Sequence, residues 1–301
     1  MMRMRFGVNL RSATSAAEFA ADVRRVDELG FDILAVPDHL GTPSPFPLLA
    51  AAATVSPRLR LRPYVLNAAF HGGGTRTAAL LARDVATVDA LSDGRVEVGI
   101  GTGWAPAEFR AAGIERRPFA ARLADLERLV VDLRARLADP DHSPRSLQTP
   151  VPIMVGAMSA EGLRIAAEHA DIVAFSGLRS VPGTNGAQLT FVSSADTAAR
   201  VADVRAARGD RPCRFDHLVQ MIDLDPDPRA AATRVAAEMP GLTADDLLDT
   251  PFALFAPTAE AAAEELLRRQ QVYGFDDVVT HHANLEEMGQ IIAAYDRLVP
   301  R

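Results

Sequence analysis

A helix, a turn, a short strand and a glycine-rich segment follow one another between Thr77 and Gly113. In the helix, apolar residues recur at spacings of three and four, which places them on one face: Leu81, Val85, Val88 and Leu91. A Ser-Asp-Gly turn ends this helix, and the strand Arg95–Gly101 follows. It runs into Gly101-Thr102-Gly103-Trp104, where missing side chains allow a ligand to approach the backbone. This order predicts one unit of an α/β protein, with a site at the carboxyl end of the strand.

The rest of the chain repeats this alternation of strands and helices. We expect strands over Arg5–Leu10, Phe31–Val36, Arg60–Leu66, Arg95–Gly101, Val151–Gly156, Asp171–Ser176, Phe215–Leu224 and Phe275–His281. Eight alternating units predict a (β/α)₈ TIM barrel. A doubly wound open sheet is the rival, but it needs a glycine fingerprint after the first strand, and Phe6–Arg11 lacks one. We expect a single domain over residues 1–301, with a loop at 177–190 and an insertion at 225–257.

Composition narrows the chemistry and the partners. The 301 residues carry a net charge of −7 and include no lysine, which disfavours nucleic acid as a partner and excludes Schiff-base catalysis. Cys213 is the only cysteine, so neither an internal disulfide nor a thiol zinc cluster is possible. The amino terminus lacks the apolar core of a signal peptide, and no apolar run reaches membrane-spanning length. We therefore expect a cytoplasmic protein with neither membrane nor nucleic-acid partners.

The central unit resembles a known family. Residues 82–104 read Ala-Arg-x-Val-Ala-Thr-x-Asp-x-Leu-Ser-x-Gly-Arg-x-x-x-Gly-x-Gly-x-Gly-Trp. This motif resembles that of the luciferase-like monooxygenase superfamily, particularly of the branch that uses the deazaflavin coenzyme F420. The resemblance implies a barrel with a cofactor at the carboxyl ends of its strands, and a homodimer formed through barrel helices. It also implies that Gly101, Thr102 and Gly103 lie against the cofactor.

Asp38 and His39 follow the second expected strand. The resemblance implies that this Asp-His pair faces the coenzyme. An imidazole there can give or take a proton while a substrate carbonyl or alcohol exchanges hydride. The alternative is that Asp38 caps the next turn and His39 only hydrogen-bonds its neighbours.

The segment from Tyr64 to Asn67 resembles the place where these proteins form a bulge behind the cofactor ring, with a cis peptide bond that involves no proline. Tyr64, Val65 and Asn67 are therefore expected at the cofactor. Relatives often continue with a histidine followed by proline, whereas this chain has His71 followed by three glycines. A role for His71 at the ligand stays open.

Trp104 stands where sugar-phosphate dehydrogenases of the F420 branch are expected to carry a glutamate acid/base. Tryptophan transfers no proton at neutral pH, which disfavours that particular activity. Its ring offers instead a flat apolar wall to a substrate or cofactor. The alternative is that it packs under the loop Pro106–Phe109.

The segment Gly156-Ala157-Met158-Ser159, with Ser176 and Gly177 after the next strand, resembles the phosphate-binding half of the family. Free N–H groups at the start of the helix after Ser159 favour an anion. The alternative is a plain strand-to-helix capping turn. Many relatives have Gly-Gly where this chain has Gly156-Ala157. His281 and His282 are expected to face solvent or to cap, because no carboxylate–histidine spacing supports a metal.

The sequence thus predicts an F420-dependent oxidoreductase that transfers hydride to or from a small organic substrate. Its candidate catalytic residues are His39, Asp38 and Trp104. One alternative is a monooxygenase that uses FMN, since reduced FMN reacts with oxygen and a deazaflavin does so poorly. The other is a barrel that binds a cofactor or ligand without catalysis.

Overall fold

The computed structural model describes residues 3–11, 13–72, 75–157, 159–181, 189–239 and 241–299. The nine strands of its main sheet are β1 (Arg5–Asn9), β2 (Ile33–Val36), β3 (Arg60–Pro63), β4 (Leu66–Asn67), β5 (Val98–Gly101), β6 (Ile153–Ala157), β7 (Ile172–Phe175), β10 (Arg214–Val219) and β13 (Asp277–His281). Their pairings are all parallel, in the order β3-β2-β1-β13-β10-β7-β6-β5-β4. Leu61 of β3 also bridges Val96, just before β5, which closes the sheet into a ring.

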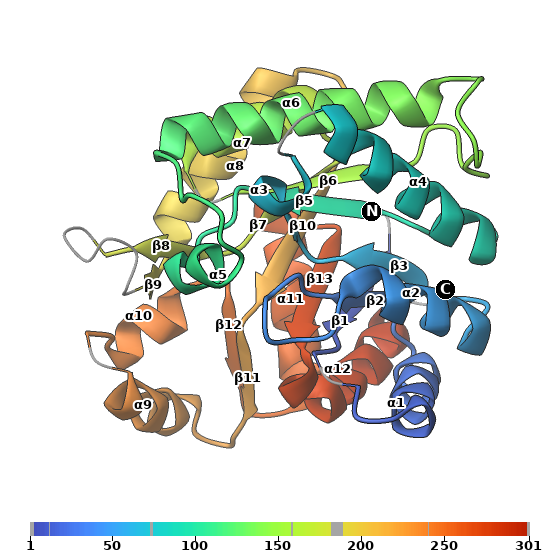
Figure 1. Cartoon of the computed structure of the whole chain (residues 1–301). Helices are drawn as coiled ribbons and strands as arrows, with labels where there is room; N and C mark the ends of the chain where they lie inside the picture. The colour runs from blue at the N-terminus through green and yellow to red at the C-terminus, as the bar shows by residue number, and fades with distance from the viewer. Residues whose placement is uncertain are drawn as a thin grey trace.

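The predicted (β/α)₈ barrel is confirmed. β3 and β4 are two halves of one barrel strand, interrupted at Tyr64 and Val65, so the ring has the eight strand positions expected. The α-helices are α1 (Ala16–Glu28), α2 (Pro45–Val55), α3 (Ala68–His71), α4 (Thr75–Leu91), α5 (Pro106–Ala111), α6 (Phe119–Ala138), α7 (Ala160–His169), α8 (Ser194–Arg208), α9 (Pro228–Glu238), α10 (Ala244–Asp249), α11 (Ala259–Tyr273) and α12 (Leu285–Leu298). Figure 1 shows α4, α6 and α7 along one side of the ring and α1, α11 and α12 along another.

Side chains that point into the ring form three layers, because every second residue of a strand faces the same side. The layer at the amino ends of the strands is ionic and contains Arg5, Arg60, Arg62, Glu97, Arg214, Asp216 and Asp277. The middle layer is a separate apolar cluster of Ala35, Tyr64, Met154, Ile172, Ala174 and Val279. By the same alternation, the layer at the carboxyl ends contains Asn9, Ser176, Gln220 and His281.

Two expectations about the elements are wrong. The strand expected over Phe215–Leu224 is divided: β10 ends at Val219, and β11 (Met221–Leu224) leaves the ring to pair with β12 (Ala253–Ala256). The cause lies at the break, where the Gln220 backbone N–H donates to Phe252 and no longer to the barrel. Leu91 does not belong to the buried face of α4, since 53% of it is exposed. Ser92 is buried in its place, and its hydroxyl donates to the Asp89 carbonyl and accepts from the Arg95 N–H.

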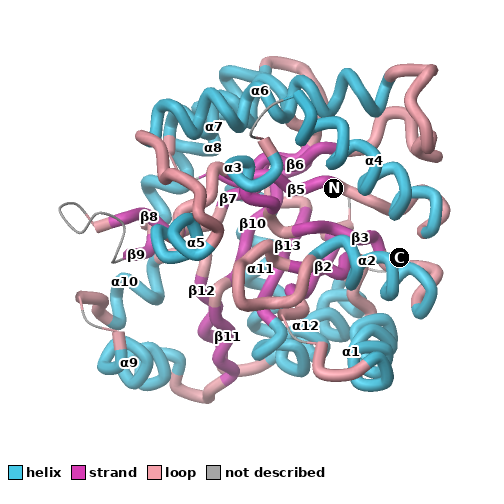
Figure 2. Tube along the Cα trace, in the orientation of Figure 1, coloured by secondary structure: helices cyan, strands magenta, loops and turns pink. Residues whose placement is uncertain are grey.

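The expected insertion lies outside the ring. It holds α9 and α10 and ends in β12, whose partner β11 lies beside it (Figure 2). In the expected loop, β8 (Leu178–Ser180) pairs antiparallel with β9 (Leu189–Phe191), and 182–188 lies outside the described residues. Among the helices in the described part of the chain, none has the length and apolar character needed to span a membrane.

Candidate active site at the carboxyl end of the barrel

Asp38 connects the end of β2 with the start of α3. Its Oδ2 accepts a hydrogen bond from the Asn67 backbone N–H at 3.0 Å and lies 3.2 Å from His71 Nε2. Burial alone would raise the pKa of Asp38, but the bonds from His71 and Asn67 outweigh it and lower the pKa. The next turn does not need Asp38 as a cap, since the Thr42 backbone N–H and hydroxyl both donate to the His39 carbonyl. Asp38 therefore fixes His71 and the entry to α3.

His39 forms a pair with a carboxylate that the sequence analysis missed. Its Nδ1 lies 2.7 Å from Glu108 Oε1, in the first turn of α5, and the two side chains are 32% and 17% exposed. The ring of Trp104 meets the His39 ring edge to face, with 6.4 Å between centroids, and half of Trp104 is exposed. The site therefore has a carboxylic acid, Glu108, although position 104 is a tryptophan and not a glutamate. The available signal was Pro106, which begins a helix that carries Glu108.

The glycines of β5 and β6 accommodate the chain itself. The Tyr64–Val65 peptide bond is cis, as the resemblance implied. A Cβ on Gly101 would lie 2.8 Å from Val65 Cγ2, and one on Gly156 would lie 3.3 Å from Val65 Cγ1. Gly101 and Gly156 make room for Val65, whose side chain occupies that space.

The segment after β5 is fixed by its neighbours. Gly103 has φ +67°, and a Cβ there would overlap the Asn67 amide, at 2.3 Å. The guanidinium of Arg122, from α6, donates to the carbonyls of Thr102, at 3.4 Å, and Gly103. This guanidinium also lies 5.9 Å from the centre of the Phe109 ring. The backbone just before Trp104 is therefore held by Asn67 at the end of β4 and by Arg122 of α6.

The expected phosphate-binding half shows a regular helix start. Ser159 caps α7, and its hydroxyl accepts from the Gly162 N–H at 3.1 Å. Ala157 ends β6 and packs on this turn, 3.0 Å from where a Gly162 Cβ would be. Met158 lies outside the described residues. Gly177 has φ +72°, and a Cβ there would overlap the Phe252 ring, so that glycine serves packing against the insertion.

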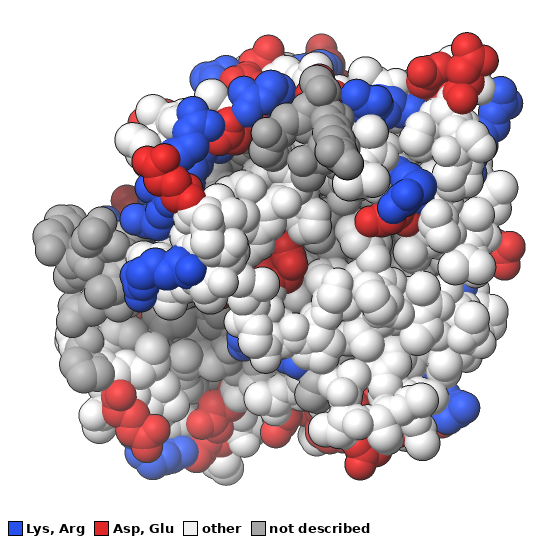
Figure 3. Space-filling view, in the orientation of Figure 1, with Lys and Arg blue, Asp and Glu red and all other residues white. Residues whose placement is uncertain are grey.

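The rim between β7 and β1 is polar. The Gln220 side-chain amide donates to the Ser176 carbonyl at 3.0 Å, and its Oε1 lies 3.0 Å from His281 Nε2. His281 is Asn9's partner across β13 and β1. Figure 3 shows a hollow near the centre of the visible face, with acidic atoms inside and mostly uncharged side chains around it.

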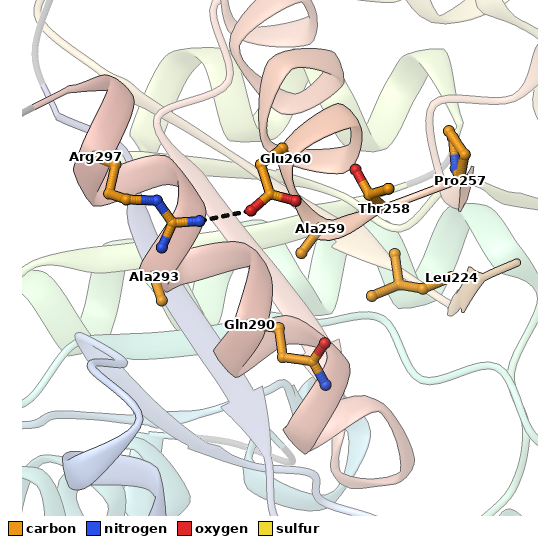
Figure 4. A pocket seen from close by; sticks show the side chains of 8 residues that line it. All are labelled: Leu224, Pro257, Thr258, Ala259, Glu260, Gln290, Ala293 and Arg297. Atoms are coloured by element: carbon orange, nitrogen blue, oxygen red, sulfur yellow. Dashed lines mark hydrogen bonds and ion pairs between the residues drawn. The ribbon is translucent and has the colours of Figure 1, made fainter. Parts of the chain in front are cut away.

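A surface cleft of about 520 Å³ lies elsewhere, between the start of α11 and α12 (Figure 4). Glu260 and Arg297 form an ion pair of 2.6 Å across it. None of the residues predicted for the site lines this cleft. The chemistry-bearing side chains gather instead at the carboxyl ends of the barrel strands, where barrel enzymes hold their active sites.

Comparisons with solved structures agree with this architecture. An F420-dependent secondary alcohol dehydrogenase in complex with an F420–acetone adduct superposes with a TM-score of 0.73 and 15% identity, over 98% of this chain and 99% of that one. Monooxygenase RslO1 from Streptomyces bottropensis gives 0.72 and 21% identity, over 98% of each chain. At these identities the likeness establishes the fold alone.

Sequence comparisons establish the family. Pyrimidine monooxygenase RutA from Allorhizobium ampelinum is 28% identical over 171 residues, which cover 52% of this chain and 44% of RutA. The chain thus spans about half the length of the pyrimidine monooxygenases it matches. The family model of the luciferase-like monooxygenases matches residues 2–290. The chain therefore belongs to the luciferase-like monooxygenase family, whose members are oxidoreductases.

Proposed function

We propose that this protein exchanges hydride between coenzyme F420 and a small organic substrate, a secondary alcohol or its ketone. The observation that carries the proposal is the 2.7 Å contact between His39 Nδ1 and Glu108 Oε1, beside the ring of Trp104. The likeness to an F420-dependent secondary alcohol dehydrogenase supports it. Asp38, the residue before His39, holds His71 and the Asn67 backbone at the same end of the barrel.

The pair can move a proton at a defined atom. With Nδ1–H donating to Glu108, neutral His39 keeps a lone pair on Nε2 and can act as a base there. As an alcohol is oxidised, its hydroxyl proton passes to Nε2, its C–H bond releases hydride, and the carbonyl forms. In the reverse direction the imidazolium returns that proton to the alkoxide oxygen. Glu108 stabilises the imidazolium and fixes the ring, as a buried carboxylate does for histidine in other enzymes.

The residues present fit a flat ring carrying a phosphate tail. Val65 offers an apolar surface held by Gly101 and Gly156, and the start of α7 offers backbone N–H groups near Ser159. Asn67, Thr102, Gly103, Ala157, Ser176 and Gly177 complete the set that would hold the cofactor. When bound, the deazaflavin supplies the carbon that takes or gives the hydride.

A second candidate is an FMN-dependent monooxygenase. The sequence match to pyrimidine monooxygenase RutA and the structural likeness to monooxygenase RslO1 favour it. A proton-transfer pair placed for an alcohol or a carbonyl favours hydride exchange instead, because oxygen activation by a reduced flavin does not require that pair.

Cofactor titration separates the two. Trp104 is the only tryptophan, so its emission reports on the site directly. We expect micromolar F420 to quench it and FMN to bind at least about tenfold more weakly. A tighter complex with FMN would overturn the proposal in favour of oxygen chemistry.

Variants then test the proton-transfer pair. We expect His39→Ala to lower kcat with secondary alcohols by about 100-fold or more, the contribution of a general base, and Glu108→Gln by about tenfold. Glu115→Gln, an exposed glutamate after α5, is the matched control and should leave kcat unchanged. Full activity in Glu108→Gln would remove Glu108 from the mechanism.

A further inference from the structure

Three buried polar atoms at the carboxyl rim of the barrel have no hydrogen-bond partner among the described residues: Asn9 Oδ1, Ser176 Oγ and His281 Nδ1. Asn9 is 2% exposed and ends β1, and it pairs in register with His281 at the end of β13. Ser176 follows β7, and Gln220 joins it to His281. Buried polar groups in folded proteins nearly always have a partner. Three such atoms along one rim therefore indicate a surface that a ligand completes.

The hydrogen bonds of Gln220 determine what His281 can offer. The Ser176 carbonyl only accepts, so the Gln220 NH₂ group must face it, and Gln220 Oε1 then faces His281 Nε2. An amide oxygen also only accepts, which puts the ring proton of neutral His281 on Nε2. Nδ1 is left with a buried lone pair. Burial lowers the pKa of His281, and the nearby charge of Arg11 lowers it further, which favours the neutral ring.

The rim thus presents two acceptors side by side, Asn9 Oδ1 and His281 Nδ1. Both can accept a hydrogen bond from a donor such as a hydroxyl or an N–H group. A carboxylate or phosphate oxygen would be repelled by them. Asn9 lies on β1, between β13, which ends in His281, and β2, which His39 follows. The two acceptors therefore lie on the side of the barrel mouth next to the proton-transfer pair.

We propose that Asn9 and His281 bind a hydroxyl or N–H group of the substrate, at a distance from the carbon that exchanges hydride, and that Gln220 positions His281 for this contact. The substrate class is then a neutral alcohol or ketone that carries a second hydrogen-bond donor. This inference rests on the proposed function only in that it takes the bound molecule to be the substrate. The binding surface itself can be tested without turnover.

The test compares probes that differ by one hydroxyl. Cyclohexanol, its vicinal diol and cyclohexanecarboxylate are titrated against the purified protein, with and without F420, and binding is followed by ligand-observed NMR. One additional hydrogen bond at a buried site corresponds to a preference of about fivefold for the diol over cyclohexanol. Equal binding of the two alcohols, or tightest binding of the carboxylate, would overturn the proposal. If F420 does not bind but the diol preference persists, the proposed function fails and the subsite stands.

Variants locate the preference. We expect Asn9→Leu and His281→Phe each to reduce the diol preference to near unity while cyclohexanol binds as before. His282→Phe, the adjacent histidine, is the matched control and should keep the preference. Circular dichroism confirms that each variant is folded, and a preference retained in both His281→Phe and Asn9→Leu would overturn the assignment.

Gln220 needs a readout of its own, because it acts through His281. In the wild type, the ring nitrogen shifts of His281 should report a single tautomer with the proton on Nε2. Gln220→Met should give a mixture of both tautomers and weaken the diol preference. A single unchanged tautomer in Gln220→Met would remove Gln220 from the proposal.

Discussion

The two ends of the barrel lumen differ in whether their buried polar atoms have hydrogen-bond or ion-pair partners. At the amino end, the Arg62 guanidinium is fully buried and contacts Glu97, Asp216 at 2.7 Å and Asp277 at 2.9 Å. None of the charged side chains described in this ionic layer has a buried atom without a partner. At the carboxyl end, Asn9, Ser176 and His281 each have one.

This difference indicates that the ionic layer at the amino end stabilises the barrel and that the polar rim at the carboxyl end serves ligand binding. A fully paired ionic layer leaves no atom for a ligand, and removing one member leaves the others as uncompensated charges. Unpaired neutral groups cost stability and are retained where a ligand benefits from them. The apolar middle layer, with Tyr64, insulates one end from the other, although the Tyr64 hydroxyl still reaches Asp216 at 2.6 Å.

The largest expected effect comes from removing the centre of the ionic layer. Arg62→Met leaves the buried Asp216 without an arginine partner and removes one partner each from Glu97 and Asp277, so we expect a loss of about 3–5 kcal/mol in the free energy of unfolding. Urea denaturation measures it. Arg25→Gln breaks an exposed pair with Glu286 and should barely change the midpoint. Similar midpoints for both variants would show that the layer does not stabilise the fold.

The ionic layer should make stability depend on pH in two ranges, an acid limb and an upper limb. Burial raises the pKa of Glu97, but Arg62 and Arg5 outweigh it and lower the pKa to about 2. The stability from Glu97 is therefore present above its ordinary value of 4.5 and is lost as pH falls toward 2.

Asp216 behaves in the opposite sense. Burial raises its pKa, Arg62 lowers it and Asp277 raises it, and the result is a pKa of about 6. Folded protein then holds a proton that the unfolded chain has released, so stability falls as pH rises from 3.8 through 6. Asp216→Asn should remove this upper limb in urea titrations between these pH values and leave the acid limb. An unchanged upper limb would assign it to other groups.

A smaller loss of stability is expected from replacing a glycine at the carboxyl end of the barrel, where close packing adds to the cost of a positive φ. Gly103 and Gly113 have nearly equal positive φ, but only Gly103 would place a Cβ against Asn67. Gly113→Ala should cost about 1–2 kcal/mol, the ordinary penalty for that conformation. Gly103→Ala should cost more and also weaken cofactor binding, measured by thermal unfolding and titration. Equal losses would show that the contact with Asn67 relaxes freely.

The repeated strand–helix pattern was enough to predict the barrel, because each strand and helix has a period visible in the sequence. The break at Gln220 was not visible, because Met221–Leu224 is as apolar and β-forming as the strand before it. Only the tertiary pairing with β12 decides where that strand goes.

At the site, position in the barrel brought Asp38, His39 and Trp104 into consideration, since all follow barrel strands. Glu108 was missed because it lies on α5, a helix of the connection, and no rule of barrel topology places it opposite His39. The packing of Val65 against Gly101 and Gly156 was not visible in the sequence, because Val65 comes from a distant part of the chain.

The smallest expected effect concerns the wall of the site. Trp104 is half exposed and meets His39 only through the edge of its ring, so Trp104→Phe should change stability by less than about 1 kcal/mol. Its apolar contact with a substrate should still matter, and we expect KM for cyclohexanol to rise about threefold with kcat nearly unchanged. Steady-state kinetics of the F420-loaded protein measures both. A fall in kcat with constant KM would mean that Trp104 orients His39, and the rim would then act on the chemistry and not only on binding.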